Sequence, residues 1–467
     1  MSRAPGRLRF DHAHVVTHDE NIEQGRAARA ILPRSAHAVY EPAAGRDPLG
    51  VLDRQHRSRL PDLVPLRIAR MLRDPFAFYR GTAAIQAADL AGAPTTGVGV
   101  VTCGDAHINN FGLFASPERA MVFDLNDFDE AAYGPWEWDV KRLVASVVIA
   151  ARGRGASEEH VRRSAQHAAE AYRDGLHESL SQEVVVRFSR AAAVHDGRRF
   201  GKDTRKVVRD LVKSSEKRTS ARLIGRITEL AEDGSLHLVE SPPRLTHVGP
   251  EIEGRVGELM DLYRATVSPD ISLLLSQHTV TDVARRVVGV GSVGTRCFIV
   301  VLTGPRGEPL ILQVKEATES VVHEFGLAPV QPVSGVDGET LAANHGYRVT
   351  ANQRILQAVS DPFLGYVTLD GFGFYVRQFR DRNVSFEVAE MTDETFDDYA
   401  MSCATILARA HSRSPNGAFV SGYIGAGTAF TDAVVDWSLA YADQSLADFE
   451  ALKAAVVAGR YHAAELA

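Results

Sequence analysis

An acidic and an amide side chain, Asp105 and Asn110, lie five residues apart in the segment GDAHINN (104–110). This segment follows a short valine-rich run that breaks at Gly104, so we expect a loop at the end of a strand. Phosphoryl transfer uses such a pair, because a carboxylate faces the attacking hydroxyl and an amide oxygen binds the metal ion. We therefore predict a catalytic role for Asp105 and a metal-binding role for Asn110, with His107 as a supporting residue.

Three further acids, Asp124, Asp127 and Asp129, end or follow a second predicted strand, AMVFDL (120–125). One of them could hold magnesium through an anionic oxygen. Capping and turn formation would also explain single acids in a loop. Because these acids gather at the ends of two neighbouring β-runs, we prefer the metal site.

A glycine-rich motif, GVGSVG (289–294), matches the pattern GxGxxG. A dinucleotide-binding fold requires a helix directly after the third glycine, whereas this chain continues as RCFIVVL, which favours a strand. Protein kinases place a glycine-rich loop over the phosphates and a lysine on a following strand, as in the run LQVK here. A plain hairpin turn with an edge-strand lysine is the alternative. The predicted cofactor-binding residues are Gly289, Gly291, Ser292, Gly294, Lys315 and Gln378, the last near the end of a strand predicted at 372–379.

The elements that must position these residues indicate a mixed α+β fold. We expect an irregular arm over residues 1–60, a helix at 63–72 that ends at the Asp74-Pro75 step, and mostly helical structure over 158–265. From Val283 the pattern changes to a three-stranded meander. Further predicted elements are an apolar helix after Gly134-Pro135, a helix at 347–359 and a helix that contains DDYAMSCATILARAHS (397–412).

Composition sets the broad class of protein. The 467 residues are 45% hydrophobic and 24% charged, which excludes collagen-like, coiled-coil and disordered chains. A net charge of −7 argues against a chain dedicated to nucleic acid. Three widely spaced cysteines give no zinc or disulfide pattern, and the apolar runs are too short to span a membrane. We expect a soluble cytoplasmic protein with a small-molecule substrate and no nucleic-acid or membrane partner; the sequence indicates no oligomeric state.

Residues 187–226 form a basic stretch, with thirteen Lys and Arg against four acids. A solvated helical face is one interpretation, and a platform for an anionic substrate is the other. The stretch is therefore no more than a hint that the acceptor is anionic.

Two other chemistries fit the sequence less well. A metallophosphatase would need further histidine-bearing loops, and besides His107 the chain offers the isolated pair Asn344-His345. A Ser-His-Asp hydrolase would need a GxSxG elbow, which the sequence lacks. His411, near the end of an apolar helix, is therefore interpreted as structural.

The segment GDAHINN resembles the GDxHxxN catalytic loop of aminoglycoside and choline kinase-like phosphotransferases. The segment DFDEAAYGPWEWD (127–139) resembles their metal-binding segment, whose aspartate, glycine and second aspartate have the spacing of Asp127, Gly134 and Asp139. Longer runs across residues 60–460 resemble the bacterial family called domain of unknown function 2252, in the protein-kinase-like superfamily. These runs are DPFAFYRG, CGDAHINNFGLFASPE, FDLNDFDE, GPWEWDVKRL, NQRILQAVSDPFLG, YVRQFRD and LARAHSRS.

The resemblance implies a role for each matching residue. The implied roles are a catalytic base at Asp105, magnesium ligands at Asn110 and Asp127, a phosphate-pairing lysine at Lys315, a phosphate cover at Gly289, Gly291 and Gly294, and a brace of the catalytic loop at Asp139.

Three points stay open after this assignment. Asp124 is an alternative metal ligand by its spacing from Asn110. Arg80 and Arg377 lie in runs that resemble the family. Two roles are open for each of them: binding of substrate or phosphate, and a structural salt bridge. The acid that orients Lys315 is not obvious; the candidates are Glu319 and Glu324, while a later helix offers Gln353 and Gln357 instead.

The order of the motifs differs from that of ordinary kinases, because the catalytic loop and Asp127 precede the glycine loop. We therefore expect a two-lobed, circularly permuted kinase-like fold whose new termini lie at exposed loops. The expected parts are an arm (1–60), the first part of the helical C-lobe with the catalytic loop and metal segment (61–275), a β-rich N-lobe (276–376) and helices that complete the C-lobe (377–467).

The implied function is that of an ATP- and magnesium-dependent phosphotransferase acting on a hydroxyl-bearing small molecule or metabolite. One alternative is a non-catalytic ATP-binding module that changes shape or partner with ATP. The other is an enzyme that transfers the nucleotidyl group. The acceptor itself stays open, because acceptor pockets differ among enzymes that share these catalytic residues.

Overall fold

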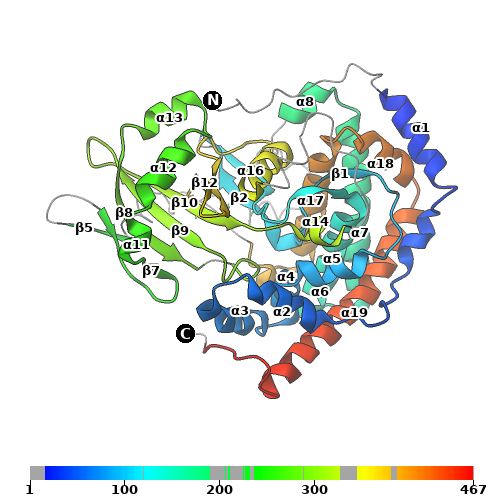
Figure 1. The fold of residues 1–467 in the computed structure, drawn as a ribbon. Helices are drawn as coiled ribbons and strands as arrows, with labels where there is room; N and C mark the ends of the chain where they lie inside the picture. The colour runs from blue at the N-terminus through cyan, green and yellow to red at the C-terminus, as the bar shows by residue number, and fades with distance from the viewer. Residues whose placement is uncertain are drawn as a thin grey trace.

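The computed structural model describes residues 16–118, 120–189, 206, 209–210, 225, 227–231, 236–287, 289–326, 344–379 and 386–465. Figure 1 shows an antiparallel sheet with short helices beside it on one side of the molecule and a group of long helices on the other. This segregation of sheet and helices confirms the predicted α+β class.

The long helices share one large apolar core. Among them, α6 (Trp136–Gly153) is buried on nearly every side, as expected for a helix that others surround. The other long helices are α7 (Glu158–Leu180), α17 (Asp393–Ser412) and α19 (Ala429–Val457). The shorter helices are α1 (His18–Ala28), α2 (Pro48–Arg57), α3 (Val64–Met71), α4 (Pro75–Arg80), α5 (Ala83–Leu90), α8 (Val184–Ser189), α11 (Pro250–Glu253), α12 (Val256–Arg264), α13 (Pro269–Leu275), α14 (Val321–Phe325), α16 (His345–Leu356) and α18 (Gly417–Ile424), with 3₁₀ turns η1 (Arg34–Ala38), η2 (Pro61–Leu63), η3 (Ile108–Asn110) and η5 (Val388–Glu390).

Six strands form the main sheet in the order β11-β12-β10-β9-β8-β7, and neighbouring strands are antiparallel. Runs of Val, Ile and Phe make these segments favourable strands. The consecutive strands β8, β9 and β10 confirm the predicted meander. The strands are β7 (Leu245–His247), β8 (Thr279–Arg286), β9 (Cys297–Thr303), β10 (Pro309–Ala317), β11 (Gly365–Leu369) and β12 (Phe372–Gln378).

The two faces of the main sheet have different neighbours. Residues directly opposite in an antiparallel pair share a face, so Lys315 and Tyr375 lie on one face and Val314 and Val376 on the other. The valine face packs against α12 and α13 in a second apolar core. Lys315 is therefore turned away from these two helices.

Two small pairs of strands carry the loops with the candidate chemistry. β1 (Gly99–Thr102) pairs with β4 (Ala132–Pro135), and β2 (Phe111–Ala115) pairs with β3 (Met121–Leu125). The loops 103–110 and 126–131 both connect these two pairs, so the topology places them side by side. The Asn126 N–H donates to the Asn110 carbonyl over 3.0 Å, which joins the two loops directly.

The helices predicted at 63–72, 347–359 and 397–412 correspond to α3, α16 and α17. The expectation that residues 1–60 are irregular is wrong for the described part, which contains α1 and α2. Thr17 and Glu20 form a capping box at the start of α1, so local polar bonds define a helix whose apolar pattern is weak.

Two boundaries also differ from the expectation. Asp74-Pro75 begins α4 rather than merely ending a helix, because Asp74 caps the Ala77 amide and Pro75 occupies the first turn. Strands β5 (Thr228–Leu230), β6 (Leu236–Leu238) and β7 interrupt the region 158–265. The basic stretch 187–226 lies outside the described residues except at 187–189, 206, 209–210 and 225.

The length and apolar character of the helices in the described ranges limit which of them could span a membrane. None is both long and apolar enough to cross a membrane by itself, and one pair, α18 with α19, meets the criterion together across a bend of 91°.

Candidate active site

A buried carboxylate holds the start of the loop after β1. The Cys103 N–H donates to Asp139 Oδ2 over 2.6 Å, and the Gly104 N–H donates to Oδ1 over 2.9 Å. Gly104 has a φ of +75°, and a Cβ there would lie 2.1 Å from the Glu130 carbonyl oxygen. Glycine is therefore required at this position, because the loops 103–110 and 126–131 approach each other too closely for a side chain.

Asp139 belongs to a buried chain of hydrogen bonds. Its Oδ2 lies 3.1 Å from His411 Nε2, and His411 Nδ1 lies 2.7 Å from the Tyr172 hydroxyl. Both Asp139 and His411 are buried. These hydrogen bonds link α6, α17 and α7. The contacts of His411 are therefore structural, and the contacts of Asp139 hold the loop 103–110 in place.

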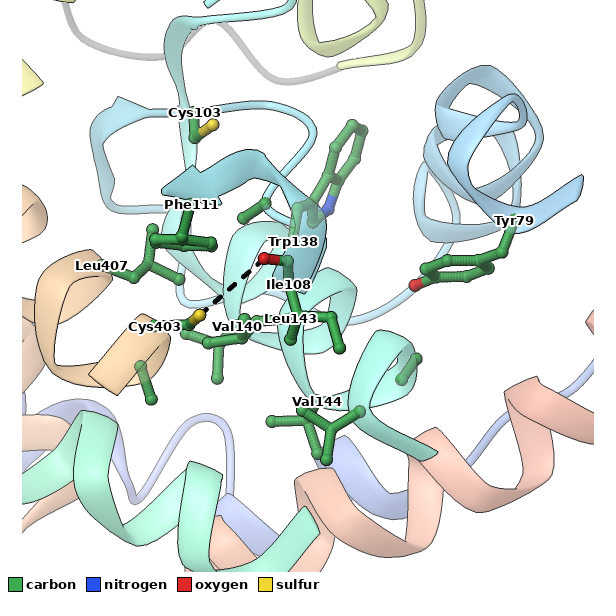
Figure 2. Close-up of a cluster of buried hydrophobic side chains, with 14 of the residues drawn as sticks. Tyr79, Cys103, Ile108, Phe111, Trp138, Val140, Leu143, Val144, Cys403 and Leu407 are labelled. Atoms are coloured by element: carbon green, nitrogen blue, oxygen red, sulfur yellow. Dashed lines mark hydrogen bonds between the residues drawn. The ribbon is translucent and has the colours of Figure 1, made fainter. Parts of the chain in front are cut away.

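Apolar side chains support the same loop. Figure 2 shows Ile108 and Phe111 among side chains from α6 and α17, with Leu407 beside Phe111. Cys403 Sγ contacts the Ile108 carbonyl at 3.8 Å, and the Tyr399 hydroxyl donates to that carbonyl over 2.6 Å. The polar residues of the loop therefore sit on a rigid base.

Asp105 is held through one of its two carboxylate oxygens. Arg142 Nε donates to Oδ1 over 2.8 Å, and the guanidinium also binds Gln86 Oε1 at 3.0 Å and the Tyr79 carbonyl at 2.7 Å. Burial lowers the pKa of Arg142, but the charge of Asp105 outweighs burial and the net pKa is raised. The Asp105 side chain is 20% exposed, so Oδ2 stays accessible to another partner.

His107 lies next to this accessible oxygen. Its Nε2 is 3.7 Å from Asp105 Oδ2, and its Nδ1 is buried without a hydrogen-bond partner in the described part of the chain. Burial lowers the pKa of His107 to about 3, so the ring is neutral at ordinary pH. His107 therefore neighbours Asp105, as predicted for a supporting residue, without adding charge.

Asn110 bridges the two loops through its side-chain amide. Nδ2 donates to the Asp105 carbonyl over 3.0 Å and to the Asp127 carbonyl over 3.1 Å. These two bonds fix the orientation of the amide group. The amide oxygen is directed away from both carbonyls and keeps its capacity to bind a cation.

Asp127 offers the second candidate oxygen for a cation. Its Oδ1 is buried, has no hydrogen-bond partner among the described residues, and lies 3.7 Å from Lys315 Nζ. Burial and the neighbouring charge of Asp129 raise the pKa of the Asp127 carboxyl. One carboxylate and one amide oxygen fit magnesium, which takes its other ligands from water and substrate phosphates. Within the described ranges, no group of three or more His, Cys, Asp or Glu side chains could hold a metal ion.

Asp124 has different contacts, which fully occupy its carboxylate. Oδ1 accepts hydrogen bonds from Arg409 Nη2 at 2.5 Å and from the Leu125 N–H at 2.9 Å. Oδ2 accepts one from the Ala358 N–H at 3.0 Å, and the side chain is 1% exposed. Asp124 is therefore a structural anchor, which leaves Asp127 as the acid that is open to a cation.

Asp124→Asn is expected to lower the free energy of unfolding by about 3 to 5 kcal/mol, because Arg409 loses the charge of its buried partner. Asp127→Asn is expected to preserve or raise it, since burial and Asp129 already disfavour the Asp127 charge. Urea unfolding of both variants measures the difference. Equal losses in the two variants would contradict these separate roles.

Lys315 reaches from β10 to the loop after β3. Its Nζ forms an ion pair with Asp129 Oδ2, and the Tyr375 hydroxyl donates to Asp129 Oδ1 over 2.9 Å. Burial lowers the pKa of Lys315, but Asp127 and Asp129 together raise it well above its ordinary value. Burial raises the pKa of Asp129, and the charge of Lys315 brings it below its ordinary value. The lysine is therefore charged and held by the acidic loop.

The acid that orients Lys315 is thus Asp129, on a loop rather than on a helix. Glu319 and Glu324 are both exposed and are not this partner. On α16 and just after it, Gln353 and Gln357 bond to each other over 3.0 Å.

The glycine loop joins β8 to β9 and ends beside Lys315, because Cys297 at the start of β9 is directly opposite the lysine. A Cβ on Gly291 would lie 3.5 Å from the Arg80 carbonyl oxygen, which places the loop against the end of α4. The glycine loop therefore contacts the end of α4 at Gly291 and leads into the strand that pairs with Lys315; it contains the predicted residues Gly289, Gly291, Ser292 and Gly294.

Residues 59–70 hold the glycine loop through its backbone carbonyls. The Leu60 N–H donates to the Gly294 carbonyl over 2.8 Å. Arg59 Nη1 donates to the Val293 carbonyl over 2.5 Å, and Arg70 Nη1 donates to that of Gly289 over 2.6 Å. Gly294 has a φ of +93°, and a Cβ there would lie 2.9 Å from the Arg59 Cβ, so the close approach requires glycine.

Gln378 is separated from this group. It is directly opposite Leu312, on the face that packs against α12 and α13, and its N–H donates to Asp361 Oδ2 over 2.8 Å. Its neighbour Arg377 lies on the lysine face, where Nε donates to Gln313 Oε1 over 3.0 Å. The cofactor-binding prediction for Gln378 does not fit this position, because alternate residues of a strand point to opposite faces.

Sequence reasoning missed Arg142, and it named Asp129 as a candidate metal ligand without its contact with Lys315. Arg142 lies within the apolar helical run VKRLVASVV, and a charge there is an available signal of a buried ion pair. Asp129 lies two residues after Asp127 in the motif DFD, and the sequence does not show which of these two acids faces Lys315.

Comparison with known proteins identifies the family. A sequence model of DUF2252, described as an uncharacterized protein conserved in bacteria, matches residues 59–455. No curated protein and no solved structure matches the chain. The match begins at Arg59, which holds the glycine loop, and extends beyond α17 into α19. Because it covers most of the sequence, the chain belongs to the DUF2252 family.

Proposed function

We propose that this chain is an ATP- and magnesium-dependent phosphotransferase that acts on a hydroxyl-bearing small molecule. One observation carries the proposal: Lys315, one strand after a glycine loop, forms an ion pair with the acidic loop that also contacts Asn110. A glycine loop, a lysine on the third strand, a metal-binding acid and a catalytic-loop acid are the parts that protein kinases use for phosphoryl transfer.

We also propose that the fold is a two-lobed, circularly permuted kinase-like fold. The contact between the end of α17 and β1 supports this hypothesis. Ser414 Oγ accepts a hydrogen bond from the Val101 N–H over 2.8 Å, and Asn416 Nδ2 donates to the Gly99 carbonyl over 3.0 Å. A short connection there would lead from the helix ending in LARAH directly into the catalytic loop, which is the order of ordinary kinases.

Asn110 and Asp127 would hold the magnesium ion, because their free amide and carboxylate oxygens belong to two loops that are bonded together. Bound magnesium would neutralise charge on the phosphate oxygens. Lys315 would pair with the phosphates, and the glycine loop would cover them with its backbone.

Asp105 would position the acceptor hydroxyl. Arg142 holds Oδ1, so the carboxylate cannot rotate freely, and Oδ2 would accept the hydroxyl proton as the oxygen attacks the terminal phosphate. The fixed support of the loop by Asp139, Ile108 and Phe111 means that this geometry exists before substrate binds.

A thermal-shift titration with ATP, with and without magnesium, tests the proposal. Wild-type protein should gain about 2.7 kcal/mol at a hundredfold excess of ATP over its Kd, and the rise in Tm should depend on magnesium. Asp127→Ala should lose the magnesium dependence. Asp261→Asn, an exposed change of one carboxylate on α12, is the matched control and should behave as the wild type.

The products distinguish the alternatives. Phosphoryl transfer releases ADP and leaves a phosphate on the acceptor, whereas nucleotidyl transfer releases pyrophosphate and leaves AMP on the acceptor, and mass spectrometry separates the two products. Magnesium-dependent ATP binding without turnover of any acceptor would favour the binding module. The absence of a thermal shift at millimolar ATP would contradict the proposed function.

A further inference from the structure

Two arginines beside the glycine loop have guanidinium groups that the described protein leaves largely unbonded. The Arg59 guanidinium makes one hydrogen bond within the described residues, to the Val293 carbonyl, and its Nε is buried without a partner. Arg80 forms no hydrogen bond or ion pair with any residue that the structure describes, and its Nε is also buried. Each guanidinium has five N–H donors, so both groups have a large unused capacity.

The fully buried Arg67 and Arg348 make more hydrogen bonds, although their Nε atoms also lack a partner among the described residues. Arg67 donates to His56, to Gln55 and to the Gly81 carbonyl, and Arg348 donates to the carbonyls of Ala131, Asp129 and Thr318. Arg59 and Arg80 are half-buried, and their Nε atoms are removed from water without a partner, which is costly. Burial lowers the pKa of Arg59 to about 10 and also lowers that of Arg80, which reflects this cost. The cost has an explanation if an anion completes the site.

Different acids of the proposed reaction centre act on the two arginines. The acidic charges that act most strongly on Arg59 are those of Glu130 and Asp129, beside Lys315. The acidic charge that acts most strongly on Arg80 is that of Asp105. Both also contact the glycine loop, Arg59 beside Gly294 and Arg80 through its carbonyl near Gly291.

We propose that Arg59 and Arg80 bind phosphate oxygens beneath the glycine loop. This inference rests on the proposed function; it adds Arg59 to the site and gives Arg80 the phosphate role that its sequence left open. A guanidinium presents parallel N–H donors that match a phosphate group, and it stays charged when buried. The phosphate belongs either to the nucleotide or to a phosphorylated acceptor. Arg59 precedes the catalytic loop in the chain, so this contact comes from a segment outside the motifs that suggested the activity.

Isothermal titration with tripolyphosphate, ATP, adenosine and inorganic phosphate tests the pair. Arg59→Gln and Arg80→Gln should each weaken tripolyphosphate binding by about tenfold or more, because a charged hydrogen bond to phosphate is lost. Adenosine binding should stay unchanged. Arg73 is an exposed arginine that lies between Arg59 and Arg80 in the sequence. The Arg73→Gln variant should bind each probe as the wild type does. Arg59→Lys, which keeps the charge, should recover part of the loss if Arg59→Gln disturbs the fold.

The outcomes show whether the phosphate belongs to the nucleotide or to the acceptor. They also distinguish a failure of the arginine proposal from a failure of the proposed function. Loss of tripolyphosphate and ATP binding together assigns the arginines to the nucleotide. Unchanged ATP binding with loss of inorganic phosphate binding at saturating ATP assigns them to the acceptor. Wild-type binding of all phosphates by both variants, or an equal loss of adenosine, would overturn the inference. Failure of wild-type protein to bind ATP would contradict the proposed function alone, because tripolyphosphate still tests the arginines.

Discussion

Asp105→Asn is expected to lower the rate of ADP release by about 10² to 10⁴-fold while ATP binding persists. The asparagine keeps an oxygen that can accept the hydrogen bond from Arg142, so the loop should retain its geometry. It removes the basic oxygen that would take the proton of the acceptor hydroxyl. Steady-state ADP release and the ATP-dependent rise in Tm, measured on the same preparation, give the two readouts.

The comparison with Asp127 makes this result specific. Asp127→Ala should lose magnesium-dependent binding, whereas Asp105→Asn should keep it and lose turnover. If Asp105→Asn retained more than a tenth of the wild-type rate, Asp105 would not be the base. If it lost ATP binding as well, the side chain would have a structural role.

Lys315→Met is expected to weaken ATP binding by about tenfold or more and to reduce turnover further, because methionine keeps the length of the side chain and removes its charge. The lysine is 2% exposed and faces two acids, so the substitution also leaves Asp127 and Asp129 without their counter-charge. Titration calorimetry with ATP and magnesium measures the affinity.

Asp129→Asn provides the matched control for this change. It keeps an acceptor for the Tyr375 hydroxyl and removes the charge that orients the lysine. A double-mutant cycle between Lys315→Met and Asp129→Asn should give a coupling free energy of about 1 to 3 kcal/mol in ATP binding, since the two groups are in contact. Additive effects of the two substitutions would show that Asp129 does not position the lysine.

The local parts of this site could be predicted from the sequence. Asp105 and Asn110 are near neighbours in one loop, and the spacing between glycines and the following β-branched run identifies the hairpin at 289–294 without any tertiary information. The same reasoning gave β8 to β10 and α17, because their apolar periodicity is strong. The weakly amphipathic helix α1 was the exception. The capping box of Thr17 and Glu20 defines this helix, and its apolar pattern does not predict it.

The long-range pairs could not be predicted in the same way. Lys315 and Asp129 are far apart in the chain, and their contact depends on how the main sheet lies against the loop after β3. The face on which Gln378 lies could not be predicted, because the face of a strand residue depends on register, which a one-residue shift reverses. Asp124 and Asp127 have similar spacing from Asn110, and only the buried contact with Arg409 separates their roles.

The hydrogen bond from the Leu60 amide to the Gly294 carbonyl makes this amide a natural reporter of the glycine loop. Its proton can exchange with solvent when the glycine loop separates from residues 59–70, and not while the two are bonded. The exchange rate at Leu60 therefore measures how often the glycine loop separates from residues 59–70, in the full-length protein and without any added label. A ligand that fastens the loop would slow this exchange, so the same amide would record both opening and occupancy.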